Sequence, residues 1–173
     1  MHDMTTATPL DDDRFWACIA AARDAAGDDV DDRVDGLEQV LLTCHPDDVA
    51  AFQHKYDELL ARAYRWDLWG AAWLMNGGCS DDGFRDFRDW LISEGEVVYE
   101  AALADPDSLA DVAPDGEVEL ESFGYVAPEV YEQLTDAPLP RGSVTDPASP
   151  AGQAWDEDAL PARFPRLARR FAA

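Results

Sequence analysis

The sequence predicts a mainly α fold, a single-domain helical bundle of about six to eight helices with at most a minor short β element. Apolar side chains recur every three or four residues over most of the chain, which is the period of one helix face. Aspartate, serine or proline stands at the start of several of these stretches, and glycine follows others, as expected of helix ends. The 173 residues, 47% of them hydrophobic, suffice to build one core.

The first three helices follow from this pattern. The first begins at the aspartates of positions 11–13, whose carboxylates cap free N–H groups, and ends near Gly27. A second helix carries an apolar face made of Val34, Leu37, Val40 and Leu41. Pro46 suits the first turn of a third helix, which is expected to run to about Arg65.

The middle of the chain is the most apolar part. The stretch Trp66–Met75 is apolar on nearly every side, which is typical of the buried centre of a bundle. The run 76–78, Asn-Gly-Gly, breaks this helix. A polar residue of 80–82 caps the next helix, which is expected to continue to about Ala104.

The remaining segments set the domain boundaries. A short strand is compatible with the alternating residues 117–123, and 126–134 is expected to be helical. We therefore predict a flexible tail over 1–10, a helical core domain over 11–136, a Pro-rich surface linker over 137–155 and a basic C-terminal helix over 156–173 that packs back on the core. Packing of that helix against the acidic stretch that precedes it would pair opposite charges.

The charge is the most unusual property of the chain. Thirteen Lys and Arg against 37 Asp and Glu give a formal net charge of −24. Such a charge disfavours direct binding to nucleic acid and to an anionic membrane, and it leaves a basic protein or peptide as a natural partner. The N-terminus has neither a basic nor an apolar leader region, so we expect a cytoplasmic protein. The oligomeric state stays open.

Metal and cofactor sites are not expected from the pattern. Cys18, Cys44 and Cys79 are far apart in the chain and form no CxxC pair, so neither a zinc knuckle nor a disulfide framework is predicted. His54, Asp57 and Glu58 share one helix face, but no second His–carboxylate pair accompanies them. We interpret that face as solvated and expect no metal and no cofactor.

The segment Asn76–Arg88 is the candidate site. Paired glycines allow a ligand to approach the backbone, and the helix start that follows offers free N–H groups to an anion. The candidates for catalysis are Cys79, Asp81 and Asp82. The candidates for ligand binding are Asn76, Gly77, Gly78, Ser80, Arg85, Arg88, Arg65, Tyr64 and Trp73. The alternative interpretation is a closed, well-capped helix corner in which the arginines pair with nearby acids.

Several stretches resemble a bacterial, typically actinobacterial, family of domains of unknown function, number 4240. They are the run 65–90 with its NGGCSDDGF segment, ADPDSLAD at 104–111, the opening DDDRFWACIAAAR and the ending WDEDALPARFPRLARRF. The resemblance extends from about Asp11 to Phe171. It implies a small stand-alone cytosolic domain and no particular activity.

Three hypotheses about function remain. The first is a binding or accessory protein that engages a basic protein or peptide, or that holds a small ligand at the Asn76–Arg88 corner. The second is a small enzyme of tailoring, cyclase or hydrolase type with its pocket at the same corner. The third is an acidic inhibitor or immunity protein that mimics nucleic acid.

Overall fold

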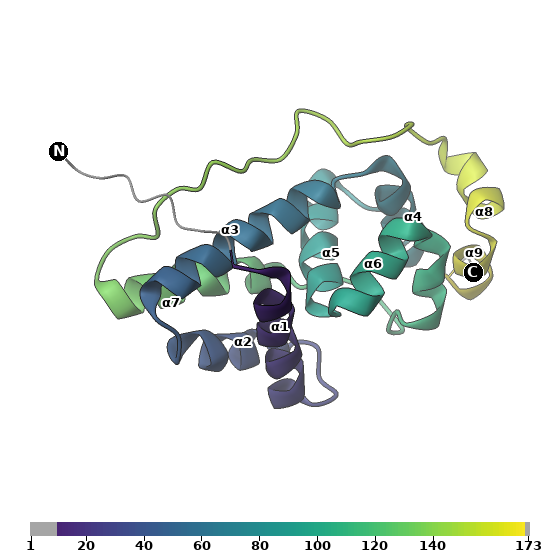
Figure 1. The fold of residues 1–173 in the computed structure, drawn as a ribbon. Helices are drawn as coiled ribbons and strands as arrows, with labels where there is room; N and C mark the ends of the chain where they lie inside the picture. The colour runs from purple at the N-terminus through teal and green to yellow at the C-terminus, as the bar shows by residue number, and fades with distance from the viewer. Residues whose placement is uncertain (1–9, 172–173) are drawn as a thin grey trace. The chain divides into compact units, whose positions relative to one another are not determined.

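A computed structural model describes residues 10–171, and it confirms the mainly α prediction (Figure 1). These residues contain nine α-helices and three 3-10 helices, and their only β pairing is an isolated bridge between Arg65 and Ala151. The chain divides into two compact units. The first unit takes in residues up to 58 together with 122–145, and the second takes in 59–121 and the chain from 146 on.

The first unit is built from four helices. They are α1 (Asp12–Ala26), α2 (Asp32–Leu42), most of α3 (Pro46–Arg62) and α7 (Val126–Thr135), which follows the 3-10 helix η2 (Glu121–Tyr125). Helix α2 packs against both α1 and α7. An aromatic row fills the core: Phe15 stacks on Phe52 with ring centroids 4.7 Å apart, and Tyr56 meets Phe123 at 6.1 Å. These rings come from three separate segments, so their burial holds the unit together.

Helices α1 and α2 are in close contact at Gly36. A Cβ built on this glycine would lie 2.4 Å from the carbonyl oxygen of Ala22. The absence of a side chain at Gly36 therefore lets the two helix backbones come into direct contact. The start of α1 is capped as predicted, since the Asp11 carboxylate accepts the Arg14 backbone N–H at 2.8 Å.

The second unit contains the apolar helix and the C-terminal segment. Its elements are α4 (Trp66–Asn76), α5 (Asp81–Ser93), α6 (Glu96–Ala104), the 3-10 helices η1 (Pro106–Asp111) and η3 (Glu157–Ala159), α8 (Leu160–Arg163) and α9 (Pro165–Phe171). Helix α4 packs against α5, η1, α8 and α9. At Gly70 a Cβ would lie 2.7 Å from Leu160 Cδ2, so α4 too uses a glycine to admit its neighbour.

The basic helix α9 lies against the acidic segment η1. Asp107 is buried, and its carboxylate accepts the backbone N–H groups of Arg166 at 3.1 Å and Leu167 at 2.9 Å. The Arg166 side chain pairs with Asp111, and that of Arg170 with Asp115 at 3.3 Å. A buried carboxylate thus caps the helix, and surface ion pairs follow on its outer turns.

One expectation about the middle of the chain is wrong, and one possibility that the sequence left open is decided. The single helix predicted from about 80 to Ala104 is broken between α5 and α6, because Gly95 has a φ of +93°, which other residues rarely adopt. Among the described residues, 117–123 form no strand. Instead, the backbone N–H of Val118 donates to Asn76 Oδ1 at 2.8 Å, and its C=O accepts from Asn76 Nδ2 at 3.2 Å. The side-chain amide of Asn76 thereby makes the two hydrogen bonds that a neighbouring strand would make with Val118.

Candidate functional site

The corner between α4 and α5 consists of two helix caps placed end to end. Gly77 has a φ of +65° and Gly78 one of +124°, and the N–H of Gly78 donates to the Trp73 carbonyl at 2.9 Å. Ser80 then caps α5, because its Oγ accepts the N–H of Gly83 at 3.1 Å. The paired glycines therefore end one helix, and the serine begins the next.

Cys79 lies inside this corner with its thiol protonated at neutral pH. Burial, with Asp86 and Glu117 as nearby negative charges, raises the pKa of the Cys79 thiol to about 11. The Cys79 carbonyl accepts the indole N–H of Trp69 at 3.0 Å. A thiol in this environment is a weak nucleophile, because the reactive form is the thiolate. The other two catalytic candidates, Asp81 and Asp82, are exposed on the first turn of α5.

Arg88 is buried by contacts within the second unit. Its guanidinium donates to both carboxylate oxygens of Asp146 at 3.1 Å and to the Leu60 carbonyl at 2.8 Å. It also lies over the rings of Tyr64 and Phe84, 4.7 and 5.0 Å from their centroids. Hydrogen bonds therefore engage the two terminal nitrogens of this cation, and aromatic rings lie against its planar face. Its buried Nε has no hydrogen-bond partner among the described residues.

The other predicted arginines also make internal pairs. Arg65 pairs with Asp67 and donates to the Leu103 carbonyl at 2.9 Å. Arg85 meets the buried carboxylate of Asp89 at 3.5 Å. The arginines chosen as anion ligands thus have carboxylates close by.

Half-buried tryptophans line one side of α4. Trp66 stacks on Trp69 with centroids 5.3 Å apart, Trp69 stacks on Phe84 at 5.1 Å, and Trp73 meets Trp155 at 5.3 Å. These contacts join α4 to α5 and to the segment before α8. The structure thus brings the predicted residues together in one unit, where most of them connect helices to one another.

An open groove of about 480 Å³ lies in the first unit, where no site was predicted. It is bordered by α3, α7 and the segment that follows α7. Its apolar lining comes mainly from this segment and includes Leu139, Val144 and three prolines, Pro128, Pro138 and Pro140. A Cβ on Gly142 would lie 3.7 Å from Asp57 Oδ2, so the segment runs directly along α3.

Carboxylates dominate the charge of this groove. Asp57, Glu129 and Glu132 line it, against a single guanidinium from Arg141. Asp57 accepts the side-chain N–H of Gln53 at 2.8 Å. Glu129 and Glu132 are exposed and form no ion pair with any described residue. The signal in the sequence was the spacing of acidic residues on α3 and α7. That spacing did not show that the Pro-rich segment after α7 would form one side of a groove beside these residues.

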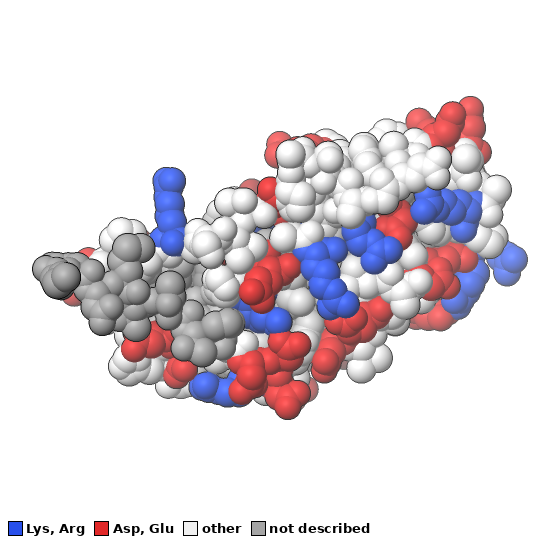
Figure 2. All heavy atoms as spheres, turned by 45° about the horizontal axis from the view of Figure 1, so that its top comes forward, with Lys and Arg blue, Asp and Glu red and all other residues white. Residues whose placement is uncertain are grey.

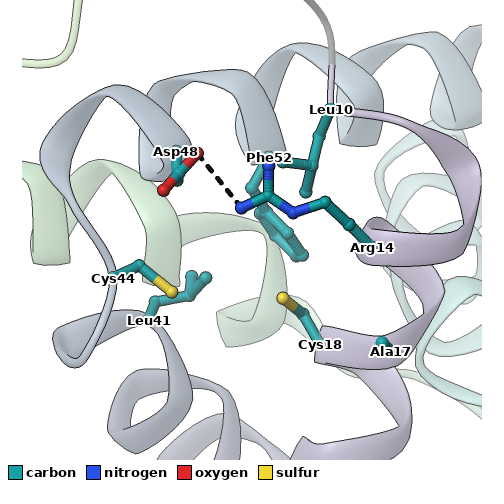
Figure 3. Close-up of a pocket in the computed structure, with 8 residues that line it drawn as sticks. All are labelled: Leu10, Arg14, Ala17, Cys18, Leu41, Cys44, Asp48 and Phe52. Carbon is teal, nitrogen blue, oxygen red and sulfur yellow. Dashed lines mark ion pairs between the residues drawn. The ribbon is translucent and has the colours of Figure 1, made fainter.

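A smaller cavity of about 190 Å³ lies elsewhere in the first unit (Figure 3). Cys18 and Cys44 line it, together with the ion pair of Arg14 and Asp48. The described part of the chain holds no group of three or more His, Cys, Asp or Glu side chains arranged to bind a metal. Between residues 10 and 171, no helix is both long and apolar enough to cross a membrane.

The fold and these surfaces define a mainly α acidic protein that carries a groove lined by carboxylates and prolines. Residues 10–133 match the family described as Protein of unknown function (DUF4240), and the chain belongs to this family. No curated protein and no solved structure matches it. The matched range includes both helices that supply the carboxylates of the groove, and it ends before the Pro-rich segment.

Proposed function

We propose that the protein is a binding protein whose groove between α3, α7 and the segment 136–145 takes a basic peptide segment of a partner protein. The observation that carries this proposal is the convergence of Asp57, Glu129 and Glu132 on one groove that also has an apolar lining. Lysine and arginine side chains match such a surface, because their apolar stems lie against hydrophobic groups while their charged ends reach carboxylates.

The charge of the whole chain supports the same function. With a net charge of −24, the protein attracts basic partners from a distance and accelerates their association. On the face shown in Figure 2, Lys and Arg side chains are scattered among Asp and Glu. Over much of that face, the cations therefore have acidic neighbours. The two unpaired glutamates of the groove remain available to a ligand.

The alternatives from the same sequence have less support. An enzyme at the Asn76–Arg88 corner requires an activated nucleophile, and the raised pKa of Cys79 opposes this. A small-ligand site there requires free polar groups, whereas Asn76 and Arg88 are both bonded within the second unit. An inhibitor that mimics nucleic acid would use the acidic surface as a whole rather than one groove.

Fluorescence anisotropy with a labelled peptide of alternating arginine and leucine tests the proposal. The double variant Glu129→Gln/Glu132→Gln should weaken peptide binding by about 2- to 30-fold, since exposed ion pairs contribute about 0.2–1 kcal/mol each. The affinity of the unaltered protein should fall as salt is added.

The control Asp24→Asn/Asp28→Asn removes the same charge from exposed positions of the first unit that do not line the groove. It should change the affinity by less than about twofold. Equal weakening by both double variants would show attraction to overall charge and would overturn the groove as the binding site. So would an unchanged affinity in the groove variant.

A further inference from the structure

Two cysteines from different segments of the first unit converge on one cavity. Cys18 lies on α1, and Cys44 lies in the turn between α2 and α3. Figure 3 shows their sulfur atoms pointing toward each other across the cavity of about 190 Å³. Twenty-five residues separate them in the sequence (44 − 18 − 1), so only the packing of α1 against α2 brings them together.

The surroundings of the two thiols are apolar on the inside and charged at the rim. Leu10, Ala17, Leu41 and Phe52 form the walls. The charged pair at the rim is Arg14 with Asp48, whose side chains meet at 3.3 Å and are partly exposed. The two thiols therefore lie between apolar walls and a rim whose charged pair has no net charge.

We propose that Cys18 and Cys44 form a two-thiolate site for a soft monovalent metal ion of the Cu(I) and Ag(I) class. Thiolates are the protein ligands that such ions prefer. Binding replaces two S–H bonds by two metal–sulfur bonds: two thiols and one M⁺ give a bis-thiolate complex of charge −1 and release two protons. No oxidant or reductant takes part.

The number and charge of the ligands select this class of ion. A structural zinc site takes about four ligands. The described residues form no group of three or more His, Cys, Asp or Glu arranged to hold a metal, and the one carboxylate at this cavity, that of Asp48, is paired with Arg14 at 3.3 Å. The complex carries a single negative charge, and the guanidinium that lines the same cavity, that of Arg14, is already paired with Asp48, so the ion pair at the rim adds no net charge. The S–H of Cys44 now donates to the Val40 carbonyl at 3.5 Å, a weak bond that the metal would replace.

Equilibrium dialysis against Ag(I) buffered by excess glutathione tests the site in the full-length protein. Glutathione removes the ion from isolated thiols, whereas two thiols held on one scaffold compete through their high effective concentration. We expect one Ag(I) per chain. Cys18→Ser and Cys44→Ser should each weaken binding at least about 100-fold, because loss of an outer-shell partner alone costs about 10- to 100-fold.

Cys79→Ser is the matched control, since Cys79 is the third cysteine and lies in the second unit. It should retain one Ag(I) per chain. In the unaltered protein, which avoids any question of folding, bound Ag(I) should slow alkylation of both Cys18 and Cys44, as measured by mass spectrometry of the digested protein. Retention of Ag(I) by the Cys18→Ser and Cys44→Ser variants, or unchanged alkylation of these two cysteines, would overturn the proposal.

Discussion

Replacing Gly36 by alanine adds one methyl group where α1 and α2 are in close contact. The new Cβ would lie 2.4 Å from the Ala22 oxygen and 3.2 and 3.3 Å from the carbonyl carbon and Cα of the same residue. All three atoms belong to the backbone of α1, so no side-chain rotation relieves the contact. The helices must separate, and the packing around Gly36 must loosen.

The magnitude follows from two opposing effects. Alanine is favoured over glycine in a helix interior by about 1 kcal/mol, so helix propensity alone predicts that Gly36→Ala is stabilising. Overpacking typically costs about 1–3 kcal/mol, and a contact with rigid backbone belongs at the upper end of that range. We therefore expect Gly36→Ala to lower the free energy of unfolding by about 2 kcal/mol. Helix propensity alone predicts a change of the opposite sign.

Urea denaturation followed by far-ultraviolet circular dichroism measures this change. With a typical slope, the midpoint should fall by about 1 M. Gly83→Ala is the matched control, since the Cβ there would meet only side-chain ends, Ser80 Oγ at 3.3 Å and Cys79 Sγ at 3.6 Å. Its unfolding free energy should not fall, and helix propensity favours alanine there by up to about 1 kcal/mol. A Gly36→Ala protein as stable as the parent would refute the reasoning.

Three further changes have outcomes that the structure predicts. Asp146→Ala leaves the buried Arg88 guanidinium with one carbonyl acceptor, and it should cost about 2–3 kcal/mol in urea denaturation, a value reduced because Asp146 is partly exposed. Gly70→Ala would place a Cβ 2.7 Å from Leu160 Cδ2, so the C-terminal segment should be cut by trypsin faster than in the parent. Burial raises the pKa of Asp86 above its usual 3.8, so its folded form holds the proton more tightly and stability falls as pH rises through that raised pKa. Asp86→Asn should therefore be more stable than the parent at neutral pH, and urea curves should show that gain shrinking at about pH 3. A gain of equal size at both pH values would contradict this assignment.

The helices themselves were largely predictable from local signals. The caps at Asp11 and Ser80 and the start at Pro46 coincide with observed helix boundaries, because a cap depends on residues only a few positions apart. The break at Gly95 was missed, since a glycine inside an apolar pattern does not reveal whether its φ is positive. The strand that the alternation over 117–123 left possible does not form, because the backbone of Val118 is hydrogen-bonded to the distant side chain of Asn76.

The candidate site shows where local reasoning stops. The Asn76–Arg88 corner was predicted as a site because glycines, acids and arginines are concentrated there. The sequence did not show that both carboxylate oxygens of Asp146, 58 positions away, would accept hydrogen bonds from Arg88. Likewise, the wide spacing of Cys18 and Cys44 predicted neither a zinc knuckle nor a disulfide framework, and it did not show that the packing of α1 on α2 would place both at one cavity.

The sequence by itself determined the helical class, most helix ends and the strongly acidic charge. These properties arise from periodicity, capping and composition, which act over a few residues or over the whole chain regardless of its path. Only the tertiary structure decided which polar groups are bonded within the protein and which face a groove. Glu129 faces the groove and Arg88 is buried against Asp146 because burial and pairing depend on segments far apart in the chain, whose meeting no local pattern specifies.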